Sequence, residues 1–177
     1  AARAMKTMGL TRLDLVTPRQ APDATALARA AGADDLLERA RVHPNLADAL
    51  AGCRLVIGSS ARLRGLNWPL LEPPAAARLL LQESAQGEVA LVFGRESSGL
   101  TNAELGLCHY LVHIPTDPGF SSLNLAAAVQ VLAYEVRRAW REGRGEQLLE
   151  EPRDLATADA EPHLVRPRKS ARHAKAG

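Results

Sequence analysis

Three segments of the chain carry side chains that could do chemistry, namely residues 58–68, 94–100 and 115–124. Each is rich in glycine, serine or arginine, and each follows an apolar run that is typical of a strand. Arginines that converge on one pocket favour a phosphate-bearing substrate, because a guanidinium binds phosphate through two parallel hydrogen bonds. A single arginine on a surface loop is usually only solvated. The arginines in or beside these segments are Arg3, Arg62, Arg64 and Arg95.

The other reactive side chains have simpler interpretations. Glu96 lies among the arginines, where it can pair with a neighbour or hold one in position for a substrate. His109 and His113 share one face of an expected strand, but no third ligand is evident nearby, so we expect no metal site. Cys108 is most simply a small core residue, and the two cysteines of the chain cannot form a disulfide framework.

The sequence lacks the motifs of several common enzyme classes. No G-x-G-x-x-G follows an expected strand and no Walker A motif is present, which disfavours a standard dinucleotide site and NTP hydrolysis. GRESSG does not fit G-x-S-x-G, which counts against an α/β-hydrolase. Aromatic residues make up only 3% of the chain, so nucleic-acid binding by rows of stacking rings is disfavoured. The net charge is +2, so any polyanion site must be a local patch.

A long helix expected in the third segment organises the candidate site. Its apolar residues recur every three or four positions, as an amphipathic helix requires, at Leu125, Val129, Leu132, Val136 and Trp140. We expect Ser121 or Ser122 to cap its first turn, since a serine oxygen can accept a bond from a free backbone N–H group. The segment is then either a well-capped helix start or a pocket where free N–H donors meet a polar ligand.

Strands and helices alternate along the chain. We expect strands at residues 13–16, 54–58, 88–94 and 110–114. We expect helices at residues 1–9, 24–31, 35–40, 46–51, 73–85 and 101–104, before the long helix. This alternation predicts an α/β fold with a mostly parallel sheet and helices on both of its faces. In such folds ligands bind outside the carboxyl ends of the strands, which is where all three segments lie.

A change of composition near the C-terminus predicts two parts. Residues 1–142 are expected to form the folded domain. Residues 143–177 turn first acidic and then basic, with few apolar side chains, and are expected to form a flexible tail that either contacts RNA or has no partner. No apolar run of membrane-spanning length and no signal peptide is visible, and free thiols suit a reducing compartment. We therefore expect a cytoplasmic protein with no membrane partner.

Four motifs, taken in order, resemble those of the SPOUT class of RNA methyltransferases, in particular the TrmJ-like branch of the SpoU/TrmH group. ARAMKTMGL resembles the first motif of the class, LVFGRESSGLTNAEL the second and IPTDPGFSSLNLAAAVQVLAYEVRRAW the third. GSSARLRGLNWP resembles the TrmJ-like loop between the first two, and the similarity covers residues 1–140. The resemblance implies an α/β fold whose C-terminal part threads a deep trefoil knot. It also implies a homodimer that uses S-adenosylmethionine to methylate a ribose 2′-hydroxyl of tRNA, in the anticodon loop.

The resemblance also assigns roles to individual residues. The cofactor would be bound in a bent shape by Ser59, Ser60, Ala61, Gly94, Ile114, Ser121, Ser122 and Leu123. The catalytic group would be Arg3, Ser122 and Asn124. Because a guanidinium stays protonated in proteins, we expect Arg3 to orient a phosphate and stabilise the alkoxide rather than to act as a base. The substrate would be bound by Arg62, Arg64 and Glu96.

The chain departs from the family pattern at both ends. It begins only two residues before Arg3, so the opening strand that normally precedes the first motif is expected to be missing. The tail is shorter than the C-terminal extension of TrmJ-like enzymes, which helps to bind tRNA. Other interpretations stay open, namely rRNA as the substrate, a non-catalytic RNA-binding relative, or an unrelated nucleotide-binding α/β protein with an unknotted sheet.

Overall fold

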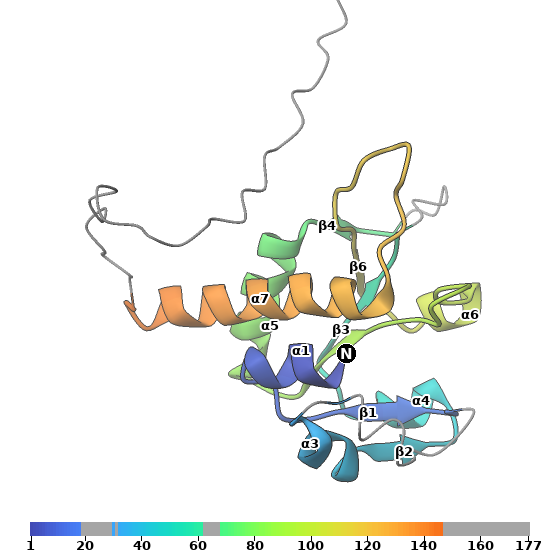
Figure 1. The fold of residues 1–177 in the computed structure, drawn as a ribbon, viewed down its shortest axis with the longest axis horizontal. Helices are drawn as coiled ribbons and strands as arrows, with labels where there is room; N and C mark the ends of the chain where they lie inside the picture. Colours follow the sequence, from blue (N-terminus) through green and yellow to red (C-terminus); the bar gives the residue numbers. More distant parts are fainter. Residues whose placement is uncertain (19–29, 31, 62–67, 147–177) are drawn as a thin grey trace, which may run out of the picture. The chain divides into compact units, whose positions relative to one another are not determined.

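The computed structural model describes residues 1–18, 30, 32–61 and 68–146, all of which belong to one compact unit, Ala1–Gln147 (Figure 1). Arg62 and Arg64 lie outside the described residues, as does most of the helix expected at residues 24–31. Only residues 143–146 of the predicted tail are described.

The described strands form two parallel sheets. In the smaller sheet, β1 (Asp14–Val16) pairs with β2 (Arg41–His43). The larger sheet has the order β4-β6-β3-β5, and its strands are β3 (Leu55–Ser59), β4 (Leu70–Leu71), β5 (Val89–Val92) and β6 (Tyr110–Val112). All pairs are parallel, which confirms the mostly parallel sheet that the sequence predicts. The sequence does not predict β2 or β4, because three and two residues are too few to show an alternating pattern.

Helices cover both faces of the four-stranded sheet, as expected. The described helices are α1 (Ala2–Thr7), α3 (Asp34–Glu38), α4 (Leu46–Ala49), α5 (Pro73–Ser84), α6 (Asn102–Leu105) and α7 (Leu125–Gly143), of which α1 and α3 pack against each other in a separate cluster. On one face, Ile57 of β3 packs in a cluster with Leu132 of α7. On the other face, Val56 packs with Leu105 of α6 and with Cys108, a core residue as predicted. Burial raises the pKa of the Cys108 thiol to about 11.

α7 lies alongside α5 and α1 (Figure 1). Leu132 of α7 packs into the core of the larger sheet, and Val129, one turn earlier, is also buried. Among the described helices, none combines the length and the apolar character that a membrane span requires.

Two histidines fix the pairing of β6 with β3. At the start of the paired strands, the backbone N–H of Val56 donates to Nδ1 of His109 at 3.0 Å. Beyond their end, Nδ1 of His113 lies 3.1 Å from the carbonyl oxygen of Ser60, and since a carbonyl only accepts, this nitrogen carries the proton. The two imidazoles therefore bind backbone groups. The part of the chain that the structure describes contains no cluster of three or more His, Cys, Asp or Glu side chains placed to hold a metal ion.

The long helix α7 begins later than the sequence predicts. Ser121 and Ser122 lie outside it, and the cap is Asn124, whose Oδ1 accepts a hydrogen bond from the backbone N–H of Ala127 at 2.7 Å. The prediction of a serine cap is wrong because the preceding turn holds Ser121 in non-helical backbone. Its carbonyl oxygen accepts a hydrogen bond from the hydroxyl of Thr116 at 3.1 Å.

The apolar stripe of α7 and the start of α6 follow the sequence more closely. Val129 and Leu132 of the stripe are buried. Trp140, the last residue of the stripe, is partly exposed, and the guanidinium groups of Arg137 and Arg144 lie over its ring, 4.4 and 4.7 Å from the ring centroid. α6 begins with the capping box that the sequence predicts.

Thr17, which follows β1, has a strained backbone. Its φ of +40° lies in the left-handed region, where a β-branched residue costs about 1–3 kcal/mol. Its backbone N–H donates to the carbonyl oxygen of His43 at 3.0 Å, a bond that any residue other than proline can keep. We expect Thr17→Asn to raise the free energy of unfolding by about 0.5–1 kcal/mol, since asparagine tolerates this region. Urea denaturation would measure this change, with Thr11→Asn as the control. An unchanged or lower stability of the Thr17 variant would contradict the prediction.

Candidate functional site

A pocket lies where the chain leaves the carboxyl ends of β3, β5 and β6, with the start of α7 as a further wall. Parallel strands that sit side by side release their following loops at the same sheet edge. The structure therefore brings together the three segments that the sequence singles out. All eight residues that were assigned to the cofactor line this pocket: Ser59, Ser60, Ala61, Gly94, Ile114, Ser121, Ser122 and Leu123.

Several other residues of the pocket were not identified from the sequence. Apolar side chains form part of its wall, from the end of β5 and from the first turn of α7. Their only signal in the sequence is that they lie within or beside the glycine- and serine-rich segments. The main ones are Phe93, Leu100, Leu125 and Ala128, together with the polar Thr116.

Residues 94–99 form a tight loop against the pocket. The backbone N–H of Arg95 donates to the carbonyl oxygen of Gly99 at 3.2 Å, and the N–H of Gly99 donates back to Arg95 at 2.8 Å. Gly99 has a φ of +70°, which favours glycine. A Cβ on Gly94 would lie 2.1 Å from the carbonyl carbon of Gly99, so only glycine fits there. The loop thus brings bare backbone to the edge of the pocket.

Arg95 is held by an acid other than the one expected. Its guanidinium donates two hydrogen bonds to the carboxylate of Glu104 in α6, at 3.0 and 3.1 Å. These bonds lower the pKa of the Glu104 carboxyl, whose Oε2 also accepts the backbone N–H of Thr101 at 2.7 Å. Glu96 lines the pocket and forms no ion pair with any arginine among the described residues. Glu104, and not Glu96, therefore holds Arg95 in position.

The segment between β6 and α7 forms an ordered turn. Asp117 accepts two backbone hydrogen bonds, from Gly119 to its side chain at 2.7 Å and from Phe120 to its carbonyl oxygen at 3.0 Å. The bond between Thr116 and Ser121 closes the turn at its base. As a result, the chain re-enters the pocket wall at Ser121, directly before the cap of α7.

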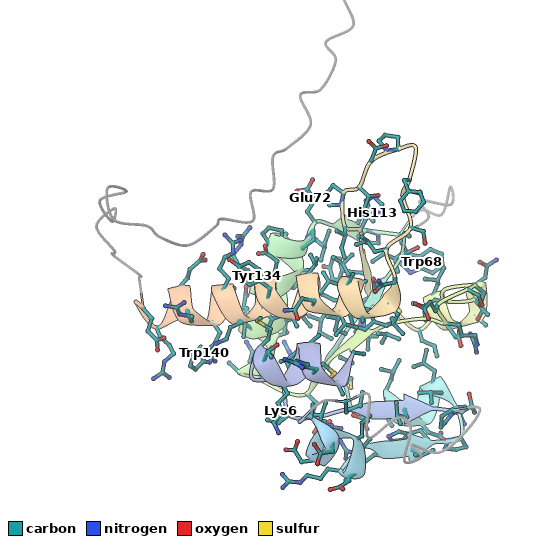
Figure 2. All side chains as sticks on the ribbon, in the orientation of Figure 1. Lys6, Trp68, Glu72, His113, Tyr134 and Trp140 are labelled. Carbon is teal, nitrogen blue, oxygen red and sulfur yellow. The ribbon has the colours of Figure 1, made fainter. Side chains whose placement is uncertain are left out.

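His113 positions the first segment. Its Nδ1–H donates to the carbonyl oxygen of Ser60, while the N–H of Ser60 donates to the carbonyl oxygen of Val112 at 3.0 Å. The backbone N–H of His113 also donates to Leu71 of β4 at 3.0 Å, and Figure 2 shows the labelled side chain beside this part of the sheet. Sequence reasoning considered His113 only as a metal ligand. Because the expected strand extends to residue 114 while β6 ends at Val112, the sequence holds no signal for a role of His113 in the loop.

Arg3 and Asn124, two of the three residues assigned to catalysis, do not line the pocket. Arg3 is exposed on α1, because the buried positions on either side of it, Ala2 and Ala4, face the interior. Asn124 lies two residues beyond Ser122, which does line the pocket, and its Oδ1 is used by the helix cap. Within the described part of the chain, its Nδ2 group makes no hydrogen bond.

Comparisons with known proteins agree with this architecture. The model of the SpoU rRNA Methylase family matches residues 1–134. The chain is 59% identical over 146 residues to the tRNA (cytidine/uridine/adenosine-2′-O-)-methyltransferase TrmJ of Pseudomonas aeruginosa, covering 82% of this chain and 57% of that protein. The chain thus spans little more than half the length of this curated relative.

Two solved structures have the same fold. TrmJ from Z. mobilis superposes with a TM-score of 0.74 at 38% identity, covering 86% of this chain and 65% of that one. A probable methyltransferase from Bordetella pertussis superposes with a TM-score of 0.71 at 46% identity, covering 78% of this chain and 85% of that one. With the family model matched over the strands and loops that build the pocket, the chain belongs to the SpoU rRNA Methylase family.

Proposed function

We propose that this protein transfers a methyl group from S-adenosylmethionine to a ribose 2′-hydroxyl of tRNA. The observation that carries the proposal is the convergence of three motif segments on one pocket at the carboxyl ends of β3, β5 and β6. The TrmJ relatives are named as tRNA 2′-O-methyltransferases that act on cytidine and uridine, and the name of the Pseudomonas aeruginosa relative adds adenosine, so we infer one of these nucleotides as the target. The name of the family model favours rRNA as the second candidate substrate.

The pocket has features that fit S-adenosylmethionine. Its walls are small side chains and exposed backbone, which can offer N–H and C=O groups to an adenine and a ribose. Gly94 packs directly against the backbone of Gly99 and Leu100, which leaves no room for a side chain there. We infer that Ser59, Ser60, Ala61, Gly94, Ile114, Ser121, Ser122 and Leu123 hold the cofactor. When bound, it supplies an electrophilic methyl group on a sulfonium.

The residues of this chain would act on the ribose. A 2′-hydroxyl becomes a good nucleophile only when its developing negative charge is stabilised or its proton is removed. We infer that the hydroxyl of Ser122 and the Nδ2–H groups of Asn124 donate to this oxygen while its proton passes to water. The cap bond of Asn124 fixes the plane of its amide, so these donors keep one direction. Arg3 would stabilise the same charge and orient the adjacent phosphate.

The position of Arg3 supports a homodimer. Because Arg3 is exposed and lies outside the pocket of its own chain, we infer that it serves the pocket of the partner subunit. We further propose that residues 1–142 form the methyltransferase domain, that its C-terminal part threads a trefoil knot, and that the enzyme acts in the cytoplasm. Arg62, Arg64 and Glu96 are our candidates for contacts with the RNA backbone and bases, and Glu96 already lines the pocket.

The proposed function is tested by methyl transfer from labelled S-adenosylmethionine to purified RNA. We expect label in a tRNA transcript, with mass spectrometry of nuclease digests locating it on the 2′-oxygen of a cytidine, uridine or adenosine. Transfer to rRNA fragments but not to tRNA would replace the proposal with the rRNA alternative. Cofactor binding without transfer to either RNA would favour a non-catalytic relative.

Gly94→Ala should weaken cofactor binding. The new methyl group would overlap the backbone at Gly99 and Leu100, 2.1 and 2.3 Å away, and must push the loop into the pocket or out of place. Overpacking by one methyl costs about 1–3 kcal/mol, so we expect the Kd for S-adenosylmethionine in calorimetry to rise by roughly tenfold or more. Gly143→Ala is the matched control, since nothing lies within 4 Å of its Cβ. If the wild type and Gly94→Ala bound S-adenosylmethionine with equal affinity, the proposal that the cofactor binds in this pocket would be wrong.

Asn124→Asp separates the two roles of Asn124. Aspartate caps a helix as well as asparagine does, so we expect the free energy of unfolding to stay within about 0.5 kcal/mol of the wild type. The variant lacks the Nδ2–H donors, and loss of one such donor lowers kcat by about 100-fold or more. Asn124→Ala, in contrast, should also lose about 1 kcal/mol of stability. A normal kcat for Asn124→Asp would show that the amide nitrogen has no part in the reaction.

A further inference from the structure

Phe120 is the most exposed large hydrophobic side chain among the described residues, with 85% of its surface accessible. Most of the other described aromatic side chains are largely covered; Trp68, Phe93 and Tyr110 pack against core clusters. A phenylalanine ring left in water contributes nothing to folding through burial. Its exposure in an ordered turn leaves the ring available to a ligand.

The turn that carries Phe120 is held without the ring. Its three hydrogen bonds come from the Thr116 hydroxyl, from the carboxylate of Asp117 and from backbone groups. None of them involves the side chain of Phe120. The ring is thus presented on a rigid support, and little conformational entropy remains to be lost when a ligand covers it.

The position of the ring relates it to the pocket. Thr116 and Ser121, which close the base of the turn, both line the pocket, and Phe120 directly precedes Ser121. The residues that flank Phe120 in the sequence are small or polar, namely Pro118, Gly119 and Ser122. A single flat ring in such surroundings lacks the contiguous apolar area that a protein interface requires. It does fit one flat aromatic ligand.

We propose that Phe120 is a stacking platform for an unpaired nucleobase of the RNA, next to the ribose that enters the pocket. This inference rests on the proposed function, which brings RNA to the pocket mouth. Proteins that read single-stranded RNA stack its splayed bases on aromatic rings. The low aromatic content of the chain disfavours rows of such rings, and one ring beside the reacting nucleotide is consistent with it.

Phe120→Ala tests the proposal by separating RNA binding from cofactor binding. Stacking of one base on an aromatic ring is worth about 1–3 kcal/mol, so we expect the Kd and KM for tRNA to rise by roughly 5- to 150-fold. The Kd for S-adenosylmethionine and the melting temperature should not change, because the ring is exposed. Phe120→Trp should keep the RNA affinity of the wild type, and Phe120→Leu should lose it as alanine does.

Tyr134→Ala is the matched control, since Tyr134 is also an exposed aromatic residue but lies on α7, outside the pocket lining (Figure 2). It should leave RNA affinity unchanged in fluorescence anisotropy. Wild-type affinity in Phe120→Ala or in Phe120→Leu would overturn stacking, even if the wild type methylates tRNA. A loss of dimer in light scattering, with RNA affinity retained, would place the ring between two copies of the chain instead. If the wild type transferred no methyl group, the proposed function would fail, and anisotropy would still decide the role of the ring.

Discussion

The pocket depends on the parallel pairing of β3 with both of its neighbours. β3 pairs with β5 on one side and with β6 on the other, so the loops that follow these three strands leave the sheet in the same direction. Every residue of β3 except the last is buried, and a Cβ on Gly58 would lie 2.8 Å from Sγ of Cys108. A shift of β3 by one residue would exchange its two buried faces and separate the loops. The core of the domain and the geometry of the site are therefore set by the same strand.

Much of this arrangement can be predicted from the sequence, because each of its main parts has a local signal. The apolar runs around Ile57 and Val92 indicate buried strands, and the capping box of α6 indicates a helix start. The start of α7 could not be predicted to the residue, since serine and asparagine cap helices equally well. Asn124 is the cap because hydrogen bonds of Thr116 and Asp117 extend the turn that precedes it.

Partners of charged side chains are harder to predict than strands and helices. In the sequence, Arg95 looks like a phosphate ligand. In the structure, both of its terminal nitrogens, Nη1 and Nη2, donate to the carboxylate of Glu104. To bind a phosphate in the same way, it would have to leave a carboxylate that also caps α6. Arg95 therefore joins the second motif loop to α6. Nine residues separate the two partners, a distance at which no helical or strand periodicity links them.

One side chain, Asn124, links the stability of α7 to the chemistry proposed at its first turn. The carboxamide of Asn124 has an acceptor and two donors in one plane. The cap bond uses the acceptor, and because the plane is rigid, it also sets the direction of the donors. A serine at this position could cap the helix, but its hydroxyl would have no second fixed donor. Asparagine thus gives a pre-organised donor without any further contact to hold it. A donor that already points at the reacting oxygen needs little reorganisation to stabilise a developing negative charge.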